Sequence, residues 1–173
     1  MHSSFPLQPT LENDLLLLRP LQEVDFEGLY KIASDPLVWE QHPSNDRYKP
    51  EVFALLFKDA MQSGGAFAVI DKLTKQIIGS TRFHAVPETT NAIEIGWTFL
   101  GRAYWGGRYN QSMKQLMMAY AFKFVDHVLF YIGGTNFRSQ KAVEKIGGTR
   151  ITSLEGQTLD TRVAAAVIYC ISK

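Results

Sequence analysis

The segment Tyr104–Asn110, with the sequence Tyr-Trp-Gly-Gly-Arg-Tyr-Asn, combines residue types that could bind an anion. The hydrophobic pattern predicts a strand before it, over Ala92–Phe99, and a helix after it, over Gln111–Val125. A glycine-rich turn that opens a helix exposes backbone N–H groups without intrahelical partners, at the positive end of the helix dipole. Such a turn often binds phosphate, although a Gly-Gly pair alone is also typical of an ordinary strand-to-helix turn.

A second group of polar residues stands at the start of another predicted helix, Asn136–Ile146, which is followed by Gly147-Gly148. Asn136 suits the N-cap position, because its side-chain oxygen can accept a hydrogen bond from a first-turn N–H group. Ser139 lies in that first turn, where capping is again an ordinary role. The apolar segment Val128–Gly133 before this helix predicts a strand.

The order strand, Trp-Gly turn, helix, strand, Asn-x-x-Ser, helix and Gly-Gly resembles the GCN5-related N-acetyltransferase (GNAT) superfamily. The most similar branch contains the ribosomal-protein N-terminal acetyltransferases. The resemblance covers the chain from about Leu11 to Lys173 and is most specific between Glu94 and Gly148. It implies a single acetyltransferase domain over residues 1–173, with residues 1–10 as an N-terminal extension. It also implies acetyl-CoA as the acetyl donor, with the CoA pyrophosphate held at the turn before the long helix.

The turn departs from the family pattern of Gly-x-Gly-x-Gly/Ala. Gly106 matches the first small position, whereas Arg108 and Asn110 occupy the second and third, and Gly107 falls at a variable position. Arg108 could obstruct the pyrophosphate, or it could turn outward and pair with a phosphate. We expect CoA binding to persist. The residues that the resemblance assigns to the cofactor are Phe99, Leu100, Trp105, Gly106, Gly107, Arg108, Tyr109, Asn110 and Asn136.

The remaining elements follow an alternating order along the chain. Strands are predicted over Asp14–Arg19, Phe67–Ile70 and Ile77–Phe83, with a closing pair around Arg150 and over Val163–Ile171. Helices are predicted over Val24–Ser34 and Pro50–Gln62, with a polar loop over Trp39–Lys49 between them. Antiparallel strands followed by one βαβ unit predict an α/β fold. In the terms of the resemblance, this is a mixed, mostly antiparallel sheet flanked by helices, with a central strand-helix-strand unit that binds CoA.

Transfer of an acetyl group from a thioester requires an unprotonated amine and stabilisation of charge on the carbonyl oxygen. Deprotonating a lysine-like amine at pH 7 costs about 4–5 kcal/mol, whereas an α-amino group costs about 1 kcal/mol. Glu94 is the candidate base, acting through water, because on a strand it shares a face with Gly96 and Thr98. The alternative is a surface carboxylate on the solvated face of the sheet.

Two further side chains are candidates for the reaction. Many GNAT relatives carry a Tyr that protonates the departing thiolate, but the matching position here is Val143. Ser139 is the replacement candidate, with helix capping as its alternative. Trp39 lies in the segment where relatives build the acceptor wall, so it is a candidate for substrate contact as well as for packing. Arg138 and Lys141 are interpreted as solvated positions, with contact to the adenosine phosphate as the alternative.

Composition is typical of a compact enzyme: 46% of the residues are hydrophobic, 20% are charged, and the formal net charge is +1. The near-neutral charge gives no reason to expect nucleic acid or membrane as a partner. The single cysteine, Cys170, is expected to be a buried thiol, and no metal site is expected. Without an export signal or a long apolar run, we expect a cytoplasmic protein that is a monomer or homodimer.

The sequence therefore predicts an acetyl-CoA-dependent N-acetyltransferase that transfers the acetyl group directly to an amine. The resemblance favours a protein or peptide N-terminal α-amine as acceptor. A small-molecule amine is the alternative within this class. A CoA-binding regulatory module that has lost catalysis is the alternative outside it, supported by Arg108 in the turn and by Val143 in place of Tyr.

Overall fold

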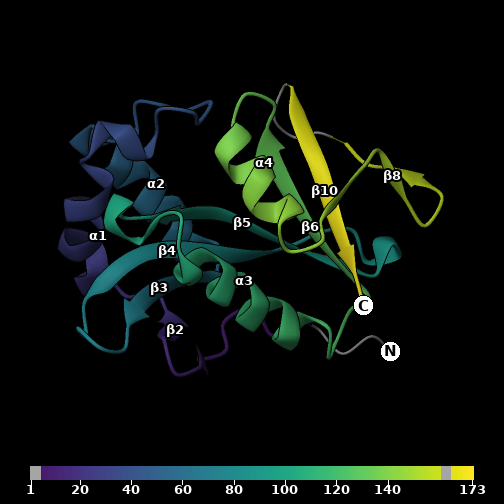
Figure 1. The fold of residues 1–173 in the computed structure, drawn as a ribbon, viewed down its shortest axis with the longest axis horizontal. Coiled ribbons are helices and arrows are strands. Elements are labelled where there is room, and N and C mark those ends of the chain that lie inside the picture. The colour runs from purple at the N-terminus through teal and green to yellow at the C-terminus, as the bar shows by residue number, and fades with distance from the viewer. Residues whose placement is uncertain (1–4, 161–164) are drawn as a thin grey trace.

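An eight-stranded sheet organises the computed structural model, which describes residues 5–160 and 165–173 (Figure 1). Its strand order is β1-β2-β3-β4-β5-β6-β10-β7. All neighbours in the sheet are antiparallel except β5 and β6, which are parallel. The strands are β1 (Leu11–Glu12), β2 (Leu16–Pro20), β3 (Ala66–Asp71), β4 (Ile77–Ala85), β5 (Ala92–Leu100), β6 (His127–Gly133), β7 (Thr149–Ile151) and β10 (Ala166–Ser172). A separate two-stranded hairpin joins β8 (Ser153–Leu154) and β9 (Gln157–Thr158).

Four α-helices accompany the sheet in the described residues: α1 (Phe26–Ala33), α2 (Pro50–Gln62), α3 (Arg108–Ala121) and α4 (Phe137–Glu144). Short 3-10 turns precede or follow several of them: η1 (Glu23–Asp25), η2 (Pro36–Val38), η3 (Glu88–Thr90) and η4 (Arg102–Tyr104). Local chemistry sets some of these boundaries. Pro50 occupies the first turn of α2, where its missing N–H costs nothing, and Asn136 caps α4. The helix α3 begins at Arg108, earlier than the Gln111 that the apolar pattern indicates.

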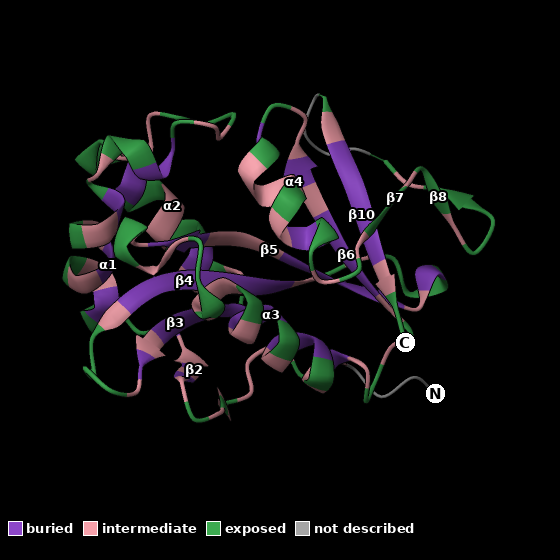
Figure 2. Cartoon of the chain, viewed as in Figure 1, coloured by how far each residue is buried: buried purple, intermediate pink, exposed green. Residues whose placement is uncertain are grey.

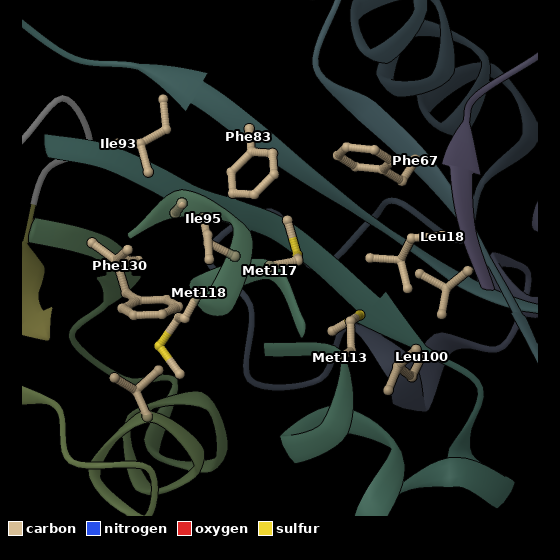
Figure 3. Packing of buried hydrophobic residues seen from close by; sticks show 14 of the residues in the cluster. Leu18, Phe67, Phe83, Ile93, Ile95, Leu100, Met113, Met117, Met118 and Phe130 are labelled. Carbon is tan, nitrogen blue, oxygen red and sulfur yellow. The ribbon is translucent and has the colours of Figure 1, made fainter. Parts of the chain in front are cut away.

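Side chains of the central strand β3 point alternately to two hydrophobic clusters, one on each face of the sheet. In β3, Phe67 and Val69 join the cluster that contains Met113 and Met117 of α3, whereas Ala66 joins the cluster under α1 and α2. Figure 2 shows that the central strands are buried, and Figure 3 shows the α3-side packing. Burial on both faces explains why β3, β6 and β10 are nearly continuous apolar runs. The mixed α/β fold predicted from the sequence is confirmed.

The pairing between β5 and β6 is short and leaves the two strands free to diverge. It joins Ala92 to His127, Ile93 to Val128 and Glu94 to Leu129, and no later pair follows. In Figure 1 the two strands separate beyond this point. An opening therefore lies in the middle of the sheet, next to the turn before α3.

A β-bulge in β5 reverses the alternation of its side chains. Gly96 pairs with Arg82 and Phe99 pairs with Ser80. Two residues of β5, Trp97 and Thr98, therefore lie opposite the single residue Thr81 of β4. Trp97 has φ +50°, a left-handed conformation that a regular strand does not contain. The expectation that Thr98 shares a face with Glu94 is wrong. Thr98 Oγ1 lies 2.9 Å from Thr81 Oγ1, whose other contact is Met117 on the α3 side.

The C-terminal strands match the closing pair predicted from the sequence. The strand β7 contains Arg150 and pairs with β10, although Val163 of the predicted strand lies outside the described residues. Cys170 of β10 is 5% exposed, which confirms the expected buried thiol. The short edge strand β1 and the β8–β9 hairpin were not predicted, because two-residue strands leave no readable period.

Candidate active site

A cavity of about 610 Å³ lies where β5 and β6 separate. Its wall is formed by the ends of these strands, the turn before α3 with the first part of that helix, one side of α4 and the loop after η2. Of the residues that the sequence assigned to a site, the lining contains Trp39, Phe99, Leu100, Trp105, Gly106, Gly107, Arg108, Asn110, Asn136 and Ser139. Two are not part of it, Glu94 and Tyr109. Residues far apart in sequence thus meet at one opening.

The N-terminus of α3 is built as an anion cradle. Gly106 has φ +67°, which favours glycine, and no atom lies within 4 Å of the position that its Cβ would take. Gly107 is the N-cap, and no side chain caps the helix there. The first-turn N–H groups of this 14-residue helix therefore face the cavity without a side-chain partner in the described residues. This arrangement fits a pyrophosphate.

Arg108 and Tyr109, which follow this turn, point in different directions. Arg108 is exposed, lines the cavity and forms no ion pair with any described residue. The hydroxyl of Tyr109 instead lies 3.5 Å from a carboxylate oxygen of Asp71, and its ring packs edge-on against Tyr104 at 4.9 Å. Only the backbone of Tyr109 is available to a ligand at the turn.

Trp105 and Arg138 form a bridge across the cavity wall. The Trp105 indole donates to the Leu100 carbonyl at 2.8 Å, and the Arg138 guanidinium lies 3.8 Å from the centre of the Trp105 ring. Arg138 also donates to the Val38 carbonyl at 3.1 Å, while its backbone N–H donates to Gln41 Oε1 at 3.1 Å. Burial lowers the pKa of Arg138. The interpretation of Arg138 as a solvated position is wrong, because these partners are about a hundred residues away in sequence and leave no local pattern.

Asn136 and Ser139 meet at the start of α4. Asn136 is 8% exposed, and its Oδ1 accepts the Ser139 N–H at 3.2 Å, which is an N-cap hydrogen bond. Both residues line the cavity. Val143, one turn further, is 1% exposed and brings an apolar surface to the wall where many relatives have a hydroxyl. The role of Ser139 in catalysis stays a prediction.

Glu94 is buried at the edge of the opening. It is 3% exposed and pairs in register with His84 of β4, so it is not a carboxylate on a solvated sheet surface. A Cβ added to Gly96 would lie 3.1 Å from Glu94 Oε1, and Gly96 lines the cavity. The glycine therefore avoids a side chain close to the carboxylate, at a position that borders the cavity.

Trp39 belongs to the wall opposite α3. It is 2% exposed, its indole donates to the Ala33 carbonyl at 2.8 Å, and its ring centre lies 5.0 Å from that of Phe99. These contacts are those of a packing residue. Trp39 nevertheless lines the cavity, so its face can also limit the space for an acceptor.

Lys114 is a cavity residue that the sequence interpretation missed. It is 6% exposed, lines the cavity, and its Nζ lies 5.4 Å from the centre of the Phe130 ring. Burial lowers its pKa to about 8. The sequence did contain a signal: Lys114 shares a helix face with Met117, Met118 and Ala121, so a lysine interrupts an apolar stripe.

A family model described as "Acetyltransferase (GNAT) domain" matches residues 16–149. The chain belongs to this family. The uncharacterized N-acetyltransferase p20 of Bacillus licheniformis is 29% identical over 118 residues, which are 65% of this chain and 66% of that protein. The described residues contain no group of His, Cys, Asp or Glu side chains that could hold a metal ion. None of the helices in the same residues has the length and apolar character required to cross a membrane.

Two solved structures illustrate how widely the GNAT fold is shared. An acetyltransferase of the GNAT family from Bacillus anthracis has a TM-score of 0.74 and 22% identity, covering 95% of this chain and 98% of its own. The microcin C7 self-immunity acetyltransferase MccE, solved with acetyl-CoA and AMP, has a TM-score of 0.71 and 16% identity, covering 97% and 99% of the two chains. At these identities the likeness is one of fold.

Proposed function

We propose that this GNAT protein transfers an acetyl group from acetyl-CoA directly to an amine. The observation that carries the proposal is the cavity that leads from the uncapped N-terminus of α3 to the separation of β5 and β6. One end offers backbone donors for a phosphate, and the other is bordered by a buried carboxylate, Glu94. A phosphate-bearing acyl donor and an amine acceptor match these two ends.

The residues of the α3 turn would hold the pyrophosphate of CoA through the N–H groups that follow Gly106 and Gly107, with Arg108 as an additional donor. When bound, acetyl-CoA supplies an activated thioester. The structure of MccE, a protein of the same fold, contains acetyl-CoA. In this chain, the Trp105–Arg138 bridge would fix the wall beside the acyl chain, because both side chains are held by hydrogen bonds.

Glu94 would accept the proton of the acceptor amine through a water molecule beside Gly96. The absence of a side chain at Gly96 would leave room for such a water next to the carboxylate. A base of this kind suits an α-amino group, whose deprotonation at pH 7 costs about 1 kcal/mol, better than a lysine side chain at about 4–5 kcal/mol. The proposed acceptor is therefore a protein or peptide N-terminal α-amine.

Lys114 would provide the proton for the departing thiolate. Its ammonium group lines the cavity and makes no hydrogen bond or ion pair with the described residues, so it is available to a ligand. Its pKa of about 8 is close to the value of about 8.5 for an ordinary thiol, which allows proton transfer at little cost. Lys114 thereby replaces the hydroxyl that is absent at Val143, and Ser139 remains the second candidate for the same step.

A small-molecule amine is the second candidate acceptor, and the loop after η2 favours it. The Pro43 ring packs against β6 so closely that a Cβ on Gly133 would lie 2.5 Å from Pro43 Cγ. The loop therefore closes one side of the acceptor end and restricts the size of what can enter.

Acetyl-CoA turnover against a panel of acceptors tests the proposed function. The panel should contain peptides with different N-terminal residues, control peptides whose lysine side chains are acetylated, free amino acids and small amines. The readouts are the release of CoA and the mass of the product. Acetylation of the α-amino group of peptides is the expected result. Acetylation of small amines alone would favour a small-molecule amine as the acceptor. Binding of acetyl-CoA without turnover on any acceptor would favour a CoA-binding module.

A further inference from the structure

The loop between η2 and α2 carries polar side chains into the acceptor end of the cavity. Pro43 packs against Gly133 of β6, and Gln41 accepts the Arg138 N–H of α4, so the loop spans from the α1–α2 layer to the other half of the sheet. This crossing places His42 and Arg47 in the cavity wall. Neither residue belongs to the turn that would hold CoA.

The hydrogen bonds of His42 determine which of its ring nitrogens carries the proton. The backbone N–H of Ser44 donates to His42 Nδ1 at 2.9 Å, so Nδ1 must present its lone pair. Burial and the nearby charge of Arg47 lower the pKa of His42 to about 4, which keeps the ring neutral at pH 7. A neutral ring with a lone pair on Nδ1 carries its hydrogen on Nε2. His42 Nε2 is therefore a donor.

Arg47 Nη1 lies 3.2 Å from this same His42 Nε2. A guanidinium has only donors, so both groups of the pair are donors and neither can accept from the other. Arg47 forms no ion pair with any residue in the described part of the chain. The two groups thus present N–H donors side by side in the cavity wall.

The charged groups around Arg47 are of both signs. Burial, together with the nearby charge of Arg82 of β4, lowers the pKa of Arg47 to about 10. The guanidinium of Arg82 stacks on Trp97, a cavity residue, at 4.4 Å and pairs with Asp59 at 2.8 Å. Its Nε is buried and has no hydrogen-bond partner among residues 5–160 and 165–173. Asp46 and Asp59 attract Arg47 but form no ion pair with it in the described residues.

We propose that Arg47 and His42 form a subsite for a carboxylate, so that the acceptor is an amine that also carries a carboxylate group. The inference rests on the acetyl transfer proposed above and narrows its acceptor. Gly96, which lies beside the Glu94 carboxylate, lines the same cavity. An acceptor with both charges would therefore direct its amine toward Glu94 and its carboxylate toward Arg47, which fixes its orientation before reaction. Free amino acids and peptides that begin with an acidic residue have this chemistry.

Pairs of acceptors that differ only in the carboxylate test the subsite. Suitable pairs are an amino acid and its amide, and peptides that begin with Asp or with Asn. We expect kcat/KM for the carboxylate member to be about 10- to 100-fold higher, the range given by a charge-assisted hydrogen bond. Arg47→Gln should remove this preference mainly through KM, and Arg47→Lys should restore part of it. In Arg47→Gln the amide members should change less than about threefold.

Matched controls separate this result from general damage. Lys58→Gln removes a positive charge from the exposed surface of α2 and should leave the preference intact. Calorimetric affinity for acetyl-CoA should be the same in Arg47→Gln and wild type, because Arg47 lies outside the α3 turn. Equal kcat/KM for both members of each pair in wild type would overturn the subsite. A preference for phosphoethanolamine over ethanolamine, without one for carboxylates, would overturn the assignment to carboxylate.

The subsite can be tested even if no acceptor is acetylated. Titration of an N-acetylated amino acid and its amide into the CoA-bound protein measures the affinity of the subsite for a carboxylate without turnover. Tighter binding of the acid, lost in Arg47→Gln, would support the subsite while the proposed acetyl transfer fails. Equal binding of acid and amide would remove the subsite whatever the outcome for catalysis.

Discussion

Glu94 of β5 and Leu129 of β6 are the last paired residues before the two parallel strands separate. The buried carboxylate therefore stands at the apex of the opening, where the strands stop bonding to each other and a ligand can enter between them. This position follows from the length of the parallel pairing. A longer ladder would close the opening, and a shorter one would expose Glu94 to solvent. The site is thus a consequence of sheet geometry.

Replacement of Glu94 by Gln tests its role as base. We expect turnover to fall by about 100-fold, the lower end of the range for general-base catalysis, while acetyl-CoA affinity stays near wild type. The loss should be largest at low pH, where more of the acceptor is protonated, and should fade as the pH approaches the pKa of the amine. That fade should occur near pH 8 for an α-amine and near pH 10 for a lysine-like amine, each to about one unit. Equal turnover of both proteins across this range would contradict the assignment.

The glycines of the α3 turn allow a test of CoA binding that leaves the fold intact. Gly107 has φ −110°, and a Cβ there would meet only the Trp105 carbonyl oxygen, at 3.9 Å. Gly107→Val should therefore preserve stability while its side chain keeps a pyrophosphate away from the helix N–H groups. We expect acetyl-CoA affinity to fall about tenfold or more in calorimetry. Gly106→Val is unsuitable because its φ of +67° would add about 1–2 kcal/mol of backbone strain. Unchanged affinity for acetyl-CoA in a folded Gly107→Val variant would show that the pyrophosphate does not bind at this turn.

The side chain of Arg108 determines whether the altered turn strengthens or weakens the binding of acetyl-CoA. If its exposed guanidinium pairs with a phosphate, Arg108→Ala should weaken acetyl-CoA binding about two- to fivefold at low salt. The loss should shrink as salt rises, since an exposed pair is screened. Titrations at several salt concentrations measure this effect. Tighter binding in Arg108→Gly would instead identify the side chain as an obstruction and would favour the non-catalytic alternative.

The parts of the site that the sequence predicted are the parts that local rules determine. The turn before α3 and the Asn136 cap each depend on residues within one helical turn. Asn136 caps α4 as predicted, and α3 follows the predicted glycine pair, although it begins at Arg108 and not at Gln111. The bulge at Trp97 depends on register against β4, which no local period reveals. The same is true of the Arg138 hydrogen bonds to Val38 and Gln41, because the loop after η2 meets α4 only in the folded chain. The contacts that close the cavity join distant parts of the chain, so they could not be predicted from the sequence.

Lys114 gives a prediction in which stability and activity change in opposite directions. Burial lowers the pKa of this lysine from 10.5 to about 8, so the folded state disfavours its charge. Below pH 8 the unfolded and folded chains are both protonated, and the folded protein carries the full cost of the buried cation, on the order of 3 kcal/mol. This cost fades as the pH rises from about 8 to 10.5, because there only the unfolded chain still holds the proton. Lys114→Met should therefore raise the free energy of unfolding at pH 7, measured by urea denaturation, and the gain should shrink toward pH 10.

Turnover of the same variant tests whether the buried ammonium group of Lys114 takes part in the reaction. If Lys114 protonates the departing thiolate, Lys114→Met should lower kcat by about 100-fold. The wild-type fall in kcat above about pH 8, where the ammonium is lost, should be absent from the variant. Lys123→Met removes an exposed charge just after α3 and should change neither stability nor the pH profile. A Lys114→Met protein that is more stable and equally active would show that the buried ammonium has no part in the reaction, and Ser139→Ala would then be the next variant to measure.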